Sequence, residues 1–127
     1  MTIFEKSYID PSDVTGFVNS IVRATEGVAD NITAYAGTSQ TGATPLTAYI
    51  NRITTVASVG DSVILPAPSA GLDVLVINAT SKALSCFPQV GGTINNLSIN
   101  THISVPAYQT GYFVSTNGVN WYTVHQL

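Results

Sequence analysis

The sequence predicts an all-β domain, a jelly-roll-like sandwich or barrel, with a short N-terminal helical arm. From Leu46 onward, short blocks rich in β-branched and aromatic residues recur at roughly ten-residue spacing, with Gly-, Pro- and Asn-rich breaks between them. One stretch near the N-terminus instead has helical periodicity. Charged residues make up only 9% of the chain, where about a quarter is usual, and Thr, Ser, Asn and Gly supply much of the polar remainder.

The helical stretch is "PSDVTGFVNSIVRATEG", which begins at Pro11. Ser12 or Asp13 can cap its start, and Gly27 can end it. Its apolar residues recur at helical spacing and form one stripe, called here the apolar stripe: Val14, Phe17, Val18, Ile21 and Val22. The stripe either packs on the protein's own β-domain or contacts a neighbouring subunit or the surface of a larger assembly.

The small and polar residues 28–45 suit an extended connector, so we expect an N-terminal arm over residues 1–45 and the all-β domain over residues 46–127. The strand blocks of the domain are "LTAYINRITTVAS", "DSVILP", "DVLVINAT", "ALSCFP", "GTINNLSIN", "HISVP", "TGYFVST" and "VNWYTVHQ". The last hairpin has Asn117 and Gly118 between its strands, a pair that suits a type I′ turn because both positions need a positive φ.

Two of these blocks are apolar on both faces. In "DVLVIN", Val74 and Val76 alternate with Leu75 and Ile77, and "TGYFVST" has the same character. No Asp, Glu, Lys or Arg lies between Ala83 and Leu127. Such strands suit subunits that pack side by side, and the residues expected at a subunit interface are Leu75, Ile77, Tyr112, Val114 and Trp121. Trp121 also suits the core.

Composition argues against several classes of partner. The net charge is −3 and the four basic residues are scattered, which disfavours nucleic acid as a partner. No apolar run is long enough for a membrane span, and the N-terminus lacks the pattern of a signal peptide, so we expect synthesis in the cytoplasm and no membrane association. Cys86 is the single cysteine, which excludes an intrachain disulfide, and we expect it to be a buried thiol.

No catalytic, cofactor-binding or metal site is predicted, and we expect the protein not to be an enzyme. His102 and His125 are far apart and belong to no metal-binding spacing. Asp61 and Asp73 lie next to turns, where turn hydrogen bonds explain them. Exposed aromatic side chains could stack on sugars, but Trp121 and Tyr122 point to opposite faces of one strand and cannot form one platform.

Four motifs occur in a fixed order between Ile50 and Val124: "GDSVILP" from Gly60, "AGLDVLVIN" from Ala70, "FPQVGGTIN" from Phe87 and "FVSTNGVNWY" from Phe113. This stretch resembles small virion proteins of tailed bacteriophages that have an all-β domain. Such domains appear in capsid decoration (cement) proteins and in pieces of head or tail fibres.

The resemblance implies a viral structural protein rather than an enzyme. We expect a capsid decoration protein, synthesised in the host cytoplasm, that binds the outer surface of the mature phage head and stabilises it. Its partners are then the major capsid protein and further copies of itself in a homotrimer. The alternative is a head or tail fibre module that binds a receptor or glycan.

Overall fold

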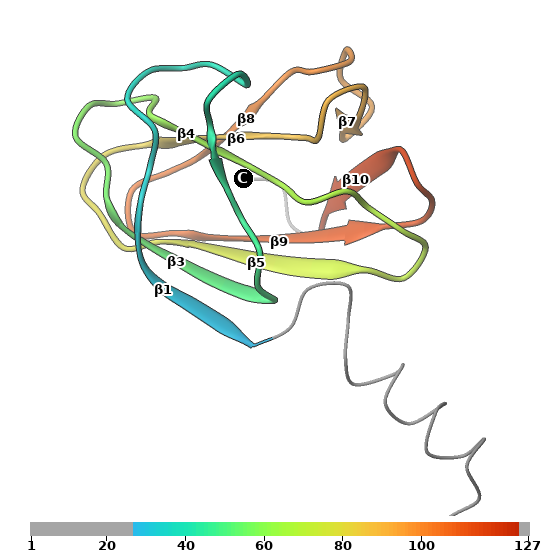
Figure 1. Cartoon of the computed structure of the whole chain (residues 1–127), viewed down its shortest axis with the longest axis horizontal. Helices are drawn as coiled ribbons and strands as arrows, with labels where there is room; N and C mark the ends of the chain where they lie inside the picture. The colour runs from blue at the N-terminus through green and yellow to red at the C-terminus, as the bar shows by residue number, and fades with distance from the viewer. Residues whose placement is uncertain (1–26, 125–127) are drawn as a thin grey trace, which may run out of the picture.

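The structure of the protein, a computed structural model, describes residues 27–124, and all its strands belong to two sheets that face each other (Figure 1). The six-stranded sheet has the order β1-β3-β5-β9-β10-β7, with β1 Val28–Thr33, β3 Ile50–Thr55, β5 Asp73–Asn78, β7 Thr93–Ile94, β9 Thr110–Ser115 and β10 Asn120–Thr123. The four-stranded sheet has the order β2-β4-β6-β8, with β2 Thr44–Pro45, β4 Ser62–Ile64, β6 Leu84–Phe87 and β8 Ile103–Val105. The prediction of an all-β domain is confirmed, and the predicted helical arm lies outside the described residues.

The chain passes alternately through the two sheets and winds as a β-solenoid from β1 to β6. Each pass places a strand parallel to the previous strand of the same sheet, so that Val28 lies beside Ile50 and Ile50 lies beside Leu75. These sequence intervals fall within the roughly 20 to 50 residues typical of repeat architectures. After β6, two strands run in the opposite direction: β8 pairs antiparallel with β6, and β9 pairs antiparallel with β5.

The jelly-roll part of the prediction is wrong. A jelly roll is an antiparallel architecture, whereas β1, β3 and β5 pair in parallel in one sheet, as do β2, β4 and β6 in the other. Parallel neighbours need a long crossover connection between them. Here the strand in the opposite sheet is part of that crossover, and short strand blocks with turns between them look the same in both architectures.

Residues 28–45, where an extended connector was expected, form the first coil instead. β1 and β2 belong to the two sheets, and Ala34 and Ala43 between them are each only 5% exposed. The coil is tied to itself by the Thr44 hydroxyl, which donates to the Thr33 carbonyl at 2.7 Å. Small residues fit here because the chain turns between two sheets within a short distance.

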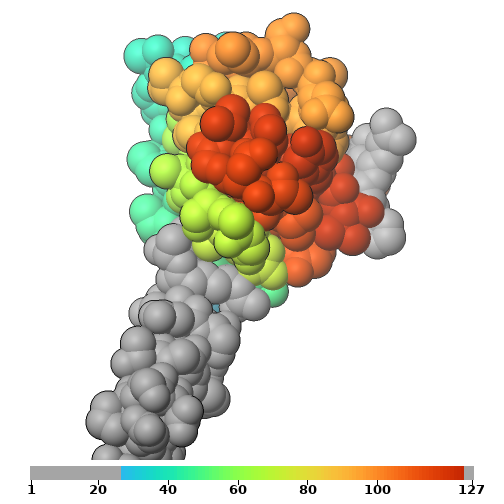
Figure 2. Space-filling model, turned by 90° about the vertical axis from the view of Figure 1, so that its right-hand side faces the viewer, coloured from blue at the N-terminus to red at the C-terminus, as the bar shows by residue number. Residues whose placement is uncertain are grey.

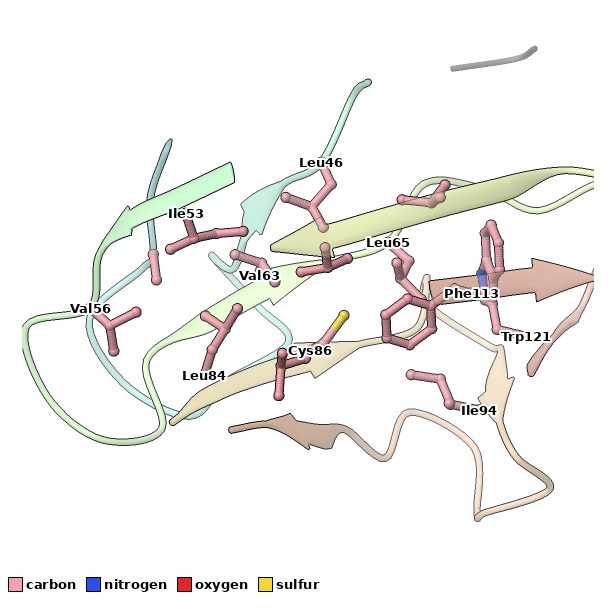
Figure 3. Close-up of a cluster of buried hydrophobic side chains, with 14 of the residues drawn as sticks. Leu46, Ile53, Val56, Val63, Leu65, Leu84, Cys86, Ile94, Phe113 and Trp121 are labelled. Atoms are coloured by element: carbon pink, nitrogen blue, oxygen red, sulfur yellow. The ribbon is translucent and has the colours of Figure 1, made fainter. Parts of the chain in front are cut away.

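The core lies between the sheets (Figure 3). Period-two alternation directs one side of each strand inward, and Val74 and Val76 of β5 are fully buried. The remaining fully buried apolar side chains come from both sheets and from the segments beside them: Ile53, Val63, Leu84, Cys86, Ile94, Val105, Phe113 and Trp121. Burial of each large apolar side chain contributes about 1.5 to 3 kcal/mol.

The last hairpin is present, but its turn is not type I′. Neither Asn117 nor Gly118 has a positive φ. Instead the Asn117 side-chain oxygen accepts hydrogen bonds from the backbone N–H groups of Val119 and Asn120, at 2.8 and 2.9 Å. An Asn side chain commonly closes a turn in this way, and it allows a wider loop between β9 and β10 than the two-residue turn that was expected.

The first strand of the solenoid is an irregular sheet edge. The pairing of β1 with β3 shifts register twice, and Asn31 within β1 has a φ of 55°. Asp30 of the same strand is paired with Arg52 of β3 at 2.8 Å. Bulges and charged side chains discourage the addition of a foreign strand, so this edge is poorly suited to strand-to-strand assembly.

Candidate binding surfaces

The outward side of the six-stranded sheet carries a contiguous apolar surface. Because Val74 and Val76 point into the core, Leu75 and Ile77 point outward. Register places Ile50 and Tyr112 on either side of Leu75. All the apolar residues of this surface are partly exposed, and together they are called the outer sheet face: Ile50, Leu75, Ile77, Tyr112, Val114 and Tyr122.

The single carboxylate of β5 does not give this face a free charge. The Tyr112 hydroxyl donates to Oδ2 of Asp73 at 2.7 Å, and Asp73 is only 8% exposed. The hydrogen bond to this carboxylate, together with burial, raises the pKa of Tyr112 to about 12. Because the bonded carboxylate lies largely under its neighbours, the middle of the face presents mainly apolar atoms.

The structure brings together four of the five residues predicted for a subunit interface. Leu75, Ile77, Tyr112 and Val114 lie on the outer sheet face, but Trp121 does not. Trp121 is fully buried in the core, with its indole N–H donating to Oε1 of Gln89 at 3.1 Å. Its alternative interpretation as a core residue is therefore the one that the structure supports.

Two residues of the outer sheet face were not predicted from the sequence, and one predicted contact lies outside the described residues. Sequence reasoning did not assign Ile50 and Tyr122 to the face, although "INRITT" alternates as β5 does and places Ile50 opposite Asn51. Tyr122 pairs with Val114 across β9 and β10 and so shares its face. The apolar stripe, which was predicted as a capsid or subunit contact, lies outside the described residues.

A second apolar surface lies at the end of the molecule shown in Figure 2, where the 88–102 connection meets the loop between β9 and β10. Four apolar side chains are exposed there and are called the apolar loop end: Val90 at 78%, Leu97 at 43%, Ile99 at 62% and Val119 at 49%. The Gln89 side-chain amide donates to the Val119 carbonyl at 3.0 Å, and the Asn100 N–H donates to the Gly92 carbonyl at 2.9 Å. The first bond joins the two loops, and the second ties the 88–102 connection to itself.

The ionisable groups with shifted pKa values act in structural roles. Asp61 is 2% exposed and accepts backbone N–H groups of Gly37 and Ser58 at 2.9 and 3.0 Å. These bonds hold the pKa of Asp61 below its ordinary value and tie the loop that contains Gly37 to the connection between β3 and β4. Burial raises the pKa of the Cys86 thiol, which keeps it in its unreactive form.

Within residues 27–124, no cluster of three or more His, Cys, Asp or Glu side chains is placed to hold a metal ion. The ring of His102 packs on Phe87 with a centroid distance of 4.9 Å. In the same range, no helix has the length and apolar character needed to cross a membrane.

Comparison of the chain with protein-family models, with curated proteins and with solved structures finds no match in any of the three.

Proposed function

We propose that this protein is a capsid decoration protein of a tailed bacteriophage, which binds the outer surface of the mature head as a homotrimer and stabilises it. The observation that carries the proposal is the apolar loop end. Val90 and Ile99 expose more than half of their side-chain surface on loops that hydrogen bonds hold together. Large apolar groups held outward on an ordered loop are typical of a surface that meets another protein.

The resemblance to virion proteins supports the same function. The motif that runs from Phe87 to Asn95 includes Val90, and the motif from Phe113 to Tyr122 includes Val119. The other two motifs supply β4 and β5, the strands that carry core residues. The residues behind the resemblance therefore include both the scaffold and part of the surface that we propose meets the shell.

The proposed function is mechanical. A protein that binds the mature shell but not its precursor stabilises the mature state by mass action. Each contact can be small, since a standard interface covers roughly 800 Å² per partner, and three linked sites in a trimer increase the avidity further. Such a function requires ordered surfaces and repeated copies.

The first experiment is quantitative mass spectrometry of purified virions, which measures copies of this chain per copy of major capsid protein. Hundreds of copies per particle are expected for a decoration protein on the lattice. A handful of copies would identify a fibre or vertex component, and absence from virions would refute a structural role in the particle. Native mass spectrometry of the free protein tests the trimer.

A variant pair tests the contact surface. Replacing Val90 or Ile99 with Asp should weaken binding to mature shells that lack the protein, because a charge would be buried without a partner. The matched control is Val59→Asp, which alters an equally exposed valine in the connection between β3 and β4. Equal binding by all three variants would exclude the apolar loop end as the contact.

A fibre module that binds a glycan is the second candidate, and Tyr108 is the observation that favours it. Its side chain is 73% exposed, and its φ of 59° is unusual for an aromatic residue. Backbone strain of this kind is often found at functional sites. Trp121 is buried and cannot stack on a sugar in this fold. Saturable glycan binding that Tyr108→Ala abolishes would support this candidate over capsid decoration.

A further inference from the structure

The outer sheet face is apolar on a protein with few charges, and no strand or helix of residues 27–124 packs on it. The four-stranded sheet covers only the inward side of the six-stranded sheet. The row formed by Ile50, Leu75 and Tyr112 crosses three adjacent strands. A contiguous, partly exposed apolar surface of this kind is typical of a face that packs against another element or a partner.

The chain enters this sheet next to that row. Gly27 immediately precedes β1, its carbonyl accepts the Ile50 N–H at 3.1 Å, and Val28 lies beside Ile50. Figure 1 shows β1 at the edge of the sheet. Gly27 therefore lies at the border of the outer sheet face, and in the sequence five residues separate the apolar stripe from β1.

Simple dimensions show that the stripe fits this face. Adjacent strands are about 4.8 Å apart, so β1 and β9 are separated by three spacings, or about 14 Å. The five residues 23–27 can span up to about 17 Å when extended. A helix over residues 14–22 would be about 13 Å long at 1.5 Å per residue, which is close to the distance of about 14 Å from β1 to β9.

Charge does not oppose this packing. Seven of the eleven Asp, Glu, Lys and Arg residues lie within the first thirty positions. The outer sheet face has its one described ion pair, Arg52 with Asp30, at the β1 edge. A helix that buries its apolar stripe on the sheet would turn its polar side, which includes Ser20, toward water.

We propose that the apolar stripe of residues 14–22 packs across the outer sheet face of its own chain. The tether sets an effective concentration of about millimolar, so at micromolar protein the chain's own stripe outcompetes that of a second copy. This inference concerns the free protein and does not rest on the proposed function. It leaves the apolar loop end as the apolar surface open to a partner.

Disulfide trapping in the full chain tests the proposal. Phe17→Cys is combined with Leu75→Cys, and the product of mild oxidation is analysed by mass spectrometry and non-reducing electrophoresis. The native Cys86 is fully buried and does not interfere. We expect an intramolecular disulfide in roughly tenfold excess over the control pairs, because a bridge needs Cα atoms within about 7 Å. A second pair, Ile21→Cys with Ile77→Cys, repeats the test if the first variant folds poorly.

Two controls separate docking from chance encounter. Ser20→Cys with Leu75→Cys places the thiol away from the stripe, and Phe17→Cys with Ser104→Cys moves the target to an exposed residue of β8 in the other sheet. Mainly dimeric disulfides would mean that the stripe docks on a second copy. Crosslinking no greater than in the controls would mean that the face is uncovered or awaits the shell. Either result overturns the proposal.

Discussion

Replacement of Asn78 by Ala should be among the most destabilising changes in this protein. Asn78 ends β5 and is 1% exposed. Its side-chain amide lies within hydrogen-bond distance of the carbonyl oxygens of Lys82, Val105 and Pro106, at 2.8, 3.0 and 3.2 Å. Its oxygen accepts the backbone N–H and the hydroxyl of Thr80. The side chain thus links the six-stranded sheet to β8 of the four-stranded sheet.

The magnitude follows from these bonds. A hydrogen bond contributes about 0.5 to 1.5 kcal/mol net, and a buried group left without a partner costs about 1 to 3 kcal/mol. Loss of the two amide N–H donors and of the acceptor for Thr80 should lower the free energy of unfolding by about 2 to 4 kcal/mol. That is a large share of the 5 to 15 kcal/mol typical of a domain.

Urea denaturation followed by the fluorescence of Trp121 measures this change. Trp121 is the only tryptophan and is fully buried, so its emission reports on the core. The control is Gln109→Ala, which removes an amide from an exposed side chain and should change stability by less than about 0.5 kcal/mol. If Asn78→Ala lowered stability no more than this control does, the two sheets would not depend on this network.

Three further predictions concern separate parts of the fold. Hydrogen bonds from Gly37 and Ser58 lower the pKa of Asp61, so its contribution to stability is present above the unfolded pKa of about 3.9 and is lost as pH falls through the lower folded value. In urea titrations from pH 6 to pH 2, the free energy of unfolding should therefore fall less steeply with pH in Asp61→Asn than in the unmodified protein. The same pH dependence in both proteins would refute this role. Gly118→Ala should leave the melting temperature nearly unchanged, since the added Cβ meets nothing within 4 Å. Gly60→Ala should lower the melting temperature, because Gly60 has a φ of 91° and the added Cβ would lie 2.5 Å from the Thr38 hydroxyl. Equal melting temperatures for the two variants would contradict this difference. The Cys86 thiol should react with a thiol reagent only in denaturant, because it is buried with a raised pKa, and rapid reaction of the native protein would show that the core opens.

The sequence predicted much of the local structure. β-Branched blocks and turn residues located most strands beyond Leu46, and the alternation in β5 correctly separated the inward Val74 and Val76 from the outward Leu75 and Ile77. The same rule could have added Ile50 to the outer sheet face. It could not have added the loop residues Val90 and Ile99, because exposure in an irregular segment has no period to read.

Other features were invisible in the sequence. The residues 28–45 have a connector-like composition, yet β1 and β2 lie within them because neighbouring strands supply their hydrogen-bond partners. The Asn117-Gly118 pair permits a type I′ turn but does not require one, and the Asn117 side chain closes a different loop. The buried network of Asn78 joins residues more than twenty positions apart, which no local pattern announces.

By itself, the sequence determined that this protein is built of short strands, which side chains of a strand share a face, and that charge is concentrated near the N-terminus. Those properties depend on the two-residue period of a strand and on composition. Only the tertiary structure decided which strand lies next to which, and hence that β1, β3 and β5 form a parallel ladder with an apolar outer face. The reason is physical: backbone hydrogen bonds between strands are the same for every residue type except proline, so pairing is chosen by how the whole chain packs its core.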